Sequence, residues 1–117
     1  MERKFEDRPV MISDGSRLLS INLDEVCRFK AAENYTDMFF TDNKKPVTLS
    51  RRLGELEKIL SQSYFVRIGR SDIINIWHVR MVMGKRIIMK DGEELLLGNK
   101  YADALEDKFF ILEEKRN

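Results

Sequence analysis

The sequence has very little of the chemistry that enzymes and metal sites use. Cys27 is its only cysteine and His78 its only histidine, so no disulfide can form within the chain and the usual zinc sites lack ligands. Catalysis by this pair would need both side chains in one cleft with a third group to orient them. We interpret Cys27, in a strand-like run, as a small buried thiol and His78 as a surface or partly packed imidazole. The sequence therefore predicts no catalytic residue, no metal site, no cofactor and no enzyme activity.

Long apolar runs and an excess of one charge are missing as well. No stretch of about 18 apolar residues could span a membrane, and the first seven residues are too polar for a signal peptide, so we expect a cytoplasmic protein. The 21 basic and 20 acidic side chains leave a net charge of +1. Residues 67–90, however, contain six basic residues and one acidic residue, a net charge of +5. Such a stretch suits contacts with phosphate groups, and it is also typical of a solvated face.

Short apolar runs separated by turn residues fill most of the chain. Asp14-Gly15-Ser16 and Asp91-Gly92 are sequences of tight hairpin turns, and Gly69-Arg70-Ser71-Asp72 interrupts an apolar run as a loop would. The pattern predicts strands at residues 10–13, 17–22, 26–32, 35–41, 46–49, 64–68, 73–75, 79–83, 86–90 and 93–97. We see no internal repeat.

Two stretches change to the helical period. Leu53, Leu56, Ile59 and Leu60 fall on one helical face, with Ser50 as the predicted N-cap, and a second helix is expected at residues 101–112. We therefore predict a mainly β domain at residues 10–112 with one central α-helix and a short C-terminal helix. Residues 1–9 are expected to be a leader or linker and residues 113–117 a polar tail.

Four segments together are more specific than any single motif in this chain. The most distinctive is Phe65-Val66-Arg67-Ile68-Gly69-Arg70-Ser71-Asp72-Ile73-Ile74-Asn75. The others are Asp24-Glu25-Val26-Cys27-Arg28-Phe29-Lys30-Ala31-Ala32-Glu33-Asn34-Tyr35, Leu49-Ser50-Arg51-Arg52-Leu53-Gly54-Glu55-Leu56-Glu57, and Lys90-Asp91-Gly92-Glu93-Glu94-Leu95 followed by Asn99-Lys100-Tyr101. In order and spacing they resemble the LytTR-type DNA-binding domain family, whose most distinctive stretch reads Phe-x-Arg-x-His-Arg-Ser-x-x-Val-Asn.

The resemblance implies a fold and a function. The fold would be LytTR-like, with stacked small antiparallel sheets whose loops enter the major groove of double-stranded DNA and bend it. The function would be sequence-specific binding of promoter DNA in bacterial transcription regulation, as the output domain of a response regulator in a two-component system. Paired copies on repeated DNA sites, and an upstream receiver domain or sensor system, are further partners that the resemblance implies.

By match to the family's loop positions, three places would face DNA. They comprise Asn34, Tyr35 and Thr36, near Asp37, then Arg70 and Ser71, and finally Asn99 and Lys100. Arg70 is the strongest candidate, because a guanidinium can bridge O6 and N7 of guanine or clamp a phosphate. The alternatives are a surface or ion-paired arginine at position 70 and a helix-start surface lysine at position 100.

Other prominent residues have structural interpretations. Arg67 alternates with two apolar residues and is expected to support the fold through an ion pair. The amide of Asn75 is expected to satisfy nearby backbone groups. Tyr35 and Trp77 are interpreted as core or shelf residues, since duplex DNA offers no unstacked bases.

The sequence departs from the family pattern at several positions. Gly69 stands where the family usually has histidine, Asp72 replaces an apolar or aromatic residue, and Gly98 stands where serine is frequent. Asn99 takes the place of a common basic residue, and Asp37 would repel phosphates. We expect these changes to alter the sequence preference or weaken binding.

Two alternatives belong to other functional classes. The first is a β-rich protein-interaction module without DNA binding, using strand edges and Phe39-Phe40, with the charges of residues 67–90 serving only solvation or an acidic partner. Salt dependence separates it from a DNA-binding domain, because binding through several phosphates weakens steeply with ionic strength. The second is a small enzyme that uses Cys27, which a thiol reagent would inactivate.

Overall fold

The computed structural model describes residues 8–14, 16–42, 44–60 and 63–113. The elements, in chain order, are β1 (Val10–Asp14), β2 (Arg17–Ile21), the 3₁₀ turn η2 (Leu23–Glu25), β3 (Val26–Ala32), β4 (Tyr35–Phe40), β5 (Val47–Leu49), α1 (Leu53–Leu60), β6 (Phe65–Arg67), β7 (Asp72–Asn75), η3 (Ile76–His78), β8 (Val79–Met83), β9 (Arg86–Met89), β10 (Glu94–Leu96), η4 (Asn99–Tyr101) and α2 (Ala102–Glu106). The predicted strands all form, and their ends differ from the predictions by no more than one residue. The mainly β fold class is confirmed.

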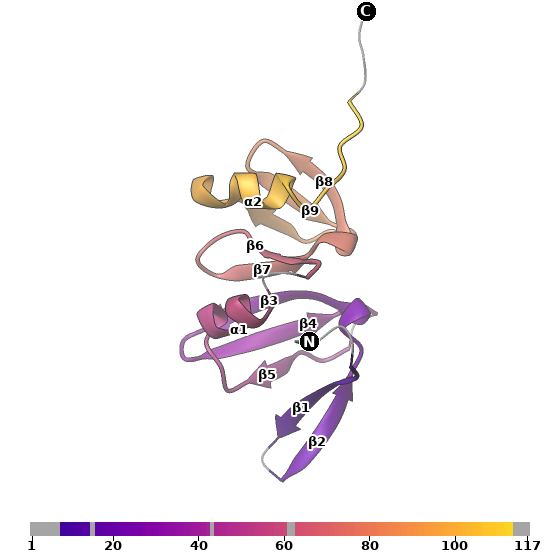
Figure 1. Ribbon diagram of the computed structural model, residues 1–117, viewed down its shortest axis with the longest axis vertical. Helices are drawn as coiled ribbons and strands as arrows, with labels where there is room; N and C mark the ends of the chain where they lie inside the picture. Colours follow the sequence, from indigo (N-terminus) through magenta and orange to yellow (C-terminus); the bar gives the residue numbers. More distant parts are fainter. Residues whose placement is uncertain (1–7, 15, 43, 61–62, 114–117) are drawn as a thin grey trace, which may run out of the picture.

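The strands form three antiparallel sheets stacked along the long axis of the molecule (Figure 1). A two-stranded sheet pairs β1 with β2, a five-stranded sheet has the order β5-β4-β3-β7-β6, and a three-stranded sheet has the order β10-β9-β8. Helix α1 contacts β3, β6 and β7, and α2 contacts β6. The hairpin β6–β7 therefore joins the two halves of the domain.

The interior consists of two hydrophobic clusters on opposite faces of the β6–β7 hairpin. Phe65 and Ile73 face the first cluster with residues of β3, β4 and α1, whereas Val66 and Ile74 face the second with residues of β9, β10 and α2. Side chains alternate between the two faces of a strand, so one hairpin can serve both clusters. This explains why residues 64–68 and 73–75 are continuous apolar runs in the sequence.

The central helix is confirmed, but it begins later than predicted. Leu53, Leu56 and Leu60 are buried as expected. The helix starts at Leu53, and the amide of Arg52 donates to the carboxylate of Glu55 at 3.3 Å while the Glu55 amide donates to the Arg52 carbonyl at 3.0 Å. The prediction of Ser50 as the N-cap is wrong, because the first helical bonds start at Arg52 and two residues separate Ser50 from the helix.

The C-terminal helix is shorter than the predicted range 101–112. It ends at Glu106, and the amides of Lys108 and Phe109 donate to carbonyls three residues earlier, at 3.1 Å each. This tighter spacing ends the α-helix. Phe110 and Leu112 follow it with 90% and 86% of their surfaces exposed, so the apolar residues there are not a buried helical face.

Asparagine residues shape two corners of the chain in the same way. Asn22 accepts from the amide of Asp24 at 3.0 Å, and Asn75 accepts from the amide of Trp77 at 2.9 Å. Asn75 is fully buried and also donates from Nδ2 to the Val26 carbonyl at 2.9 Å. The predicted structural role of Asn75 is confirmed, since its amide satisfies two backbone groups.

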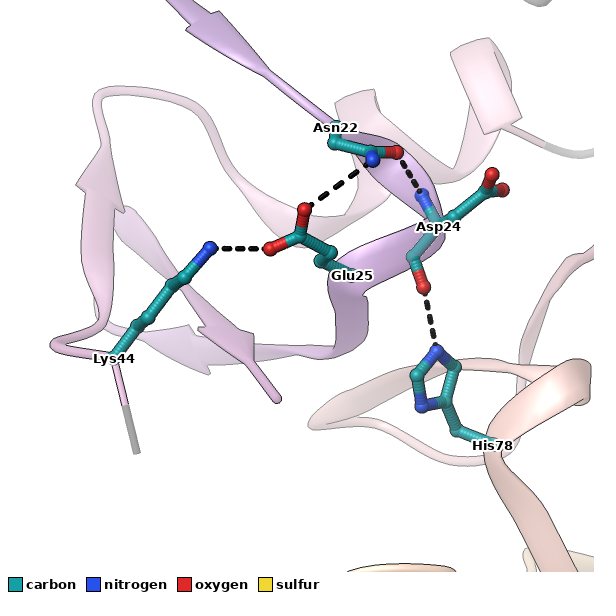
Figure 2. A network of polar contacts seen from close by, with 5 residues as sticks. All are labelled: Asn22, Asp24, Glu25, Lys44 and His78. Atoms are coloured by element: carbon teal, nitrogen blue, oxygen red, sulfur yellow. Dashed lines mark hydrogen bonds and ion pairs between the residues drawn. The ribbon is translucent and has the colours of Figure 1, made fainter. Parts of the chain in front are cut away.

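Figure 2 shows how the first corner contacts the second. Nε2 of His78 donates to the carbonyl of Asp24 at 2.7 Å, and Nδ2 of Asn22 donates to Glu25 at 3.2 Å. Glu25 is also paired with Lys44, whose ammonium lowers the pKa of the Glu25 carboxyl. His78 is therefore a partly packed, hydrogen-bonded residue, as the sequence predicted.

Candidate nucleic-acid interface

Several connections between strands lie together at one end of the five-stranded sheet, where its strands begin or end. In the antiparallel register Lys30 lies opposite Asp72, and Thr36 lies opposite Leu49. The turn after β3, the segment after β5 and the loop before β7 are consequently at the same ends of their strands. Figure 1 shows the β3–β4 turn and the β6–β7 loop on its left side, below the start of α2.

Backbone hydrogen bonds add the third sheet to this end. The amide of Gly98 donates to the carbonyl of Ile68 at 2.7 Å, and the amide of Leu97 donates to the carbonyl of Lys85 at 2.7 Å. The turn between β8 and β9 and the segment before η4 therefore lie beside the β6–β7 loop. We call residues 33–35, 50–52, 69–71, 84–85 and 98–100 together the loop edge.

Arg67 holds the β6–β7 loop in place from inside. Its Nε donates to the carbonyl of Gly69 at 2.8 Å, and its Nη2 donates to the carbonyl of Arg70 at 2.9 Å. Its Nη1 forms an ion pair with Glu57 of α1 at 2.8 Å, which confirms the predicted ion pair. The carbonyl of Ser71 accepts from the amide of Ala31 at 2.8 Å. The loop backbone is thus fixed to α1 and β3.

The loop edge brings together six of the seven predicted DNA-binding residues as exposed groups. They are Asn34, Tyr35, Arg70, Ser71, Asn99 and Lys100. Among the described residues, Arg70 and Lys100 have no carboxylate within ion-pair distance, and Nζ of Lys100 lies 5.3 Å from the ring centre of Tyr101. Oδ1 of Asn34 accepts from Nη2 of Arg52 at 2.9 Å. The edge therefore presents these two cations and several amide groups to solvent.

Thr36 does not share this position. Its side chain is fully buried, and its hydroxyl donates to the carbonyl of Arg51 at 2.7 Å. The expectation that Thr36 contacts DNA is not supported by this placement, because alternation along β4 turns its side chain inward between the outward Tyr35 and Asp37. It ties β4 to the segment before α1.

Three basic residues of the loop edge were not among the seven predicted DNA-binding residues, although Lys85 belongs to the basic stretch of residues 67–90. Arg51 and Arg52 precede α1, and Lys85 lies in the turn between β8 and β9; all three are exposed. Nη1 of Arg51 lies 3.6 Å from the carboxylate of Glu55. In the sequence, Lys85 could be recognised as a turn residue, and Arg51 and Arg52 as residues that follow a strand. That these three residues lie beside the β6–β7 loop follows only from the strand register.

The basic stretch of residues 67–90 does not form a single surface. Arg67 is internal, Arg86 is paired with Glu94, and Lys90 is bonded through its amide to the carbonyl of His78 at the other end of β9. Only Arg70 and Lys85 of that stretch lie on the loop edge. The local charge of +5 therefore overstated the charge that this stretch gives to one face.

The sequence of this chain matches the model of one known protein family. The family model of the LytTr DNA-binding domain matches residues 16–110. The chain belongs to the LytTR DNA-binding domain family. Among solved structures it is similar to one from Bacillus cereus, described as the LytTr DNA-binding domain of a methyl-accepting/DNA response regulator. The TM-score is 0.67 and the identity 20%, over 86% of this chain and 94% of that chain. No curated protein sequence matches.

The structure shows which groups surround three residues that depart from the LytTR pattern. A Cβ atom on Gly98 would lie 3.0 Å from the Tyr101 ring and 3.4 Å from the Ile68 carbonyl, so a serine there would require the ring to move. A Cβ on Gly69 would meet only the Leu96 carbonyl at 3.8 Å. Asp72 is paired with Arg28 at 3.1 Å, which neutralises its charge within the LytTR domain.

Cys27 and His78 line one surface cavity of 580 Å³ in this LytTR domain. The thiol is 3% exposed, which confirms the predicted burial, and that burial raises its pKa. His78 is bonded to the Asp24 carbonyl. A protonated thiol and an engaged imidazole do not make an activated nucleophile. No cluster of metal-ligating side chains is present among the described residues.

Both aromatic residues interpreted as core or shelf are more exposed than a core position allows. Trp77 is 70% exposed and Tyr35 51% exposed. A core position is wrong for both, because Trp77 lies in the 3₁₀ turn η3 and Tyr35 begins β4 with its side chain outward.

No helix in the described part of the LytTR domain is long and apolar enough to cross a membrane.

Proposed function

We propose that this LytTR domain binds double-stranded DNA sequence-specifically through the loop edge and acts in the cytoplasm as a bacterial transcription regulator. The observation that carries the proposal is the position of Arg70. Its guanidinium is exposed and has no ion-pair partner among the described residues, while the backbone that bears it is held by Arg67 and Ala31. A cation on a preorganised loop loses little conformational entropy on binding.

The chemistry of the loop edge suits both parts of DNA recognition. Arg70 can bridge O6 and N7 of guanine in the major groove, and the amide of Asn99 can bond a base edge. Lys100 and Lys85 can neutralise phosphates on either side and fix the register of the protein on the duplex. The proposed partners are promoter DNA, a second copy of the domain on a repeated site, and an upstream receiver domain or sensor system.

Selection of bound duplexes from a random pool at moderate salt tests the proposal. We expect one recurrent motif with the unaltered chain, and we expect Arg70→Ala and Lys100→Ala each to weaken binding to it by about 1–3 kcal/mol if they contact bases. Lys90→Ala is the matched control, since Lys90 is an exposed lysine at the other end of β9.

The outcome separates the alternatives. A pool without enrichment and negligible affinity at low salt would overturn the DNA-binding proposal and favour the protein-interaction module. Equal losses for Arg70→Ala and Lys90→Ala would show that DNA binding uses a face other than the loop edge.

The basic residues that only the structure places on the edge give a separate prediction. We expect Arg51→Gln and Lys85→Gln each to lower the slope of log K against log salt concentration by about 0.9, because each removes one phosphate contact. The sequence motif should stay the same, since phosphate contacts do not read bases. Titrations at several salt concentrations measure the slope, and Lys90→Gln should leave it unchanged.

A further inference from the structure

The order of elements in this domain occurs twice. A hairpin, a 3₁₀ corner, three further strands and a helix form the first unit, from β1 to α1, and the same series forms the second, from β6 to α2. The sheets agree as well, because β5-β4-β3 in the first unit matches β10-β9-β8 in the second. We treat β3 and β8, and likewise β2 and β7, as equivalent strands.

The two corners correspond bond by bond. Each begins with an asparagine that caps a 3₁₀ turn, Asn22 and Asn75, and each ends with a valine whose amide donates back into that turn. The amide of Thr41 donates to the Glu25 carbonyl at 2.9 Å, and in the second unit the amide of Lys90 donates to the His78 carbonyl at 2.7 Å. The equivalence therefore extends to the backbone that surrounds each corner.

The strand registers correspond too. The pairing of β3 with β4 shifts between Val26 and Arg28, and the pairing of β8 with β9 shifts between Val79 and Met81. These positions differ by 53 residues, as do Asn22 and Asn75. A bulge at the same place in both hairpins makes β8 the structural counterpart of β3, residue for residue.

The units differ in what their outer strands contact. β3 pairs with β7, and through it the hairpin of the second unit joins the sheet of the first. Among the described residues, β8 pairs only with β9 and β2 pairs only with β1. In the described part of the chain, the edge of β8 that corresponds to the β7-facing edge of β3 is therefore unpaired. The edge of β2 that corresponds to the β3-facing edge of β7 is likewise unpaired there.

We propose that these two edges pair between copies of this chain, so that β8 of one copy joins β2 of the next in an antiparallel arrangement. The register follows from the junction inside the chain, where Arg28, Phe29 and Lys30 lie opposite Ile74, Ile73 and Asp72. The equivalent pairs between copies are Met81 with Ile21, Val82 with Ser20, and Met83 with Leu19.

The side chains at the two edges are chemically complementary. Inside the chain Arg28 pairs with Asp72 at 3.1 Å. Met81, which is 41% exposed, and Leu19 of the neighbouring copy are the equivalent diagonal neighbours, so an apolar contact replaces the ion pair. Met83 and Val82, 50% and 43% exposed, extend the apolar edge of β8. Unpaired strand edges with apolar side chains are templates for another strand.

The positions of the two edges require a second molecule. In Figure 1, β8 lies toward one end of the long axis and β2 toward the other. One copy cannot bring them together, so the contact is head-to-tail between copies. This pairing follows the internal junction of β3 with β7 and does not depend on DNA binding.

Disulfide trapping in solution tests the register. Lys30 and Asp72 lie directly opposite each other; their counterparts Met83 and Leu19 in neighbouring copies should have Cα atoms within disulfide range. We expect a mixture of Met83→Cys and Leu19→Cys chains to form on the order of tenfold more cross-linked dimer than Met83→Cys with Leu112→Cys, which reports random collision. Cys27 is buried and stays in every variant.

A charge exchange provides the second measurement. Met81→Arg and Leu19→Asp should each weaken self-association alone, and a chain that carries both substitutions should associate again, because every contact between copies then repeats the pairing of Arg28 with Asp72. Circular dichroism verifies that both variants fold. Trapping at the level of the Leu112→Cys control, or a preference for two Met83→Cys chains, would overturn the proposed pairing. Failure of the doubly substituted chain to associate more strongly than the single variants would overturn it as well.

Discussion

Replacing Asn75 by alanine is expected to lower the free energy of unfolding by about 3 kcal/mol. Asn75 is fully buried and satisfies both the carbonyl of Val26 and the amide of Trp77, each at 2.9 Å. Alanine leaves these two backbone groups without their partner, and an unsatisfied buried polar group costs about 1–3 kcal/mol. Urea denaturation followed by circular dichroism measures the loss, with an unchanged m-value showing that the folded and unfolded states keep their exposed areas.

The equivalent corner of the first unit contains the control. Asn22→Ala removes the same capping bond to the amide two residues later, but Asn22 is exposed and water can replace it. We expect a loss of about 1 kcal/mol or less there. Equal losses at both positions would show that burial, and the bond to Val26, do not set the effect.

Substituting Arg67 by methionine is expected to weaken specific DNA binding by about 10- to 100-fold, although its guanidinium points into the domain. The change removes the bonds that Nε and Nη2 donate to the carbonyls of Gly69 and Arg70, at 2.8 and 2.9 Å. Each hydrogen bond from a charged donor contributes roughly 1.5–3 kcal/mol. Without these two bonds the loop would have to become ordered when DNA binds, and part of that energy would be lost from the binding free energy.

Glu57→Gln is the matched control for this prediction. It removes the charge that Nη1 of Arg67 contacts at 2.8 Å and leaves both loop bonds in place. We expect binding of the selected duplex to change less than about threefold in this variant. If Arg67→Met bound the duplex as tightly as the unaltered chain, the loop would not need the arginine for its conformation, and the support that we assign to Arg70 would be refuted.

Most of the secondary structure could be predicted because alternation and turn chemistry are local. Asp91-Gly92 and the apolar alternation around it are enough to define a hairpin, and Gly92 has the positive φ of 93° that such a turn uses. The end of the second helix could not be predicted in this way. Phe109 and Leu112 continue the apolar spacing of Leu105, but Leu112 is 86% exposed, because spacing alone does not show whether a face has anything to pack against.

The candidate site was partly accessible from the sequence. The family resemblance placed Arg70 and Lys100 on neighbouring loops, and the structure brings those loops together. The inward side chain of Thr36 and the arrival of Arg51 at the same edge depend on the register of β4 with β5, which is a contact between distant residues. Alternation between Tyr35 and Asp37 was a signal for Thr36 that the interpretation did not use.

The twofold recurrence of the elements was missed for a different reason. The corners share Asn22 with Asn75 and Val26 with Val79, but the residues between them differ, as do the lengths of the hairpins. The backbone hydrogen bonds and strand registers correspond, whereas the side chains differ and contact different neighbours. Arg28 and Met81 occupy equivalent positions, but the first side chain is charged and the second is apolar.

The open edges of β2 and β8 also determine how large an assembly can become. In a row of any number of copies, one β8 edge and one β2 edge remain unpaired at the ends, so the contact has no built-in stopping point. A strong contact of this kind would polymerise the free protein into fibres. With moderate affinity, the proposed pairing would let the length of the bound DNA, and not the protein surface, limit the number of copies that assemble.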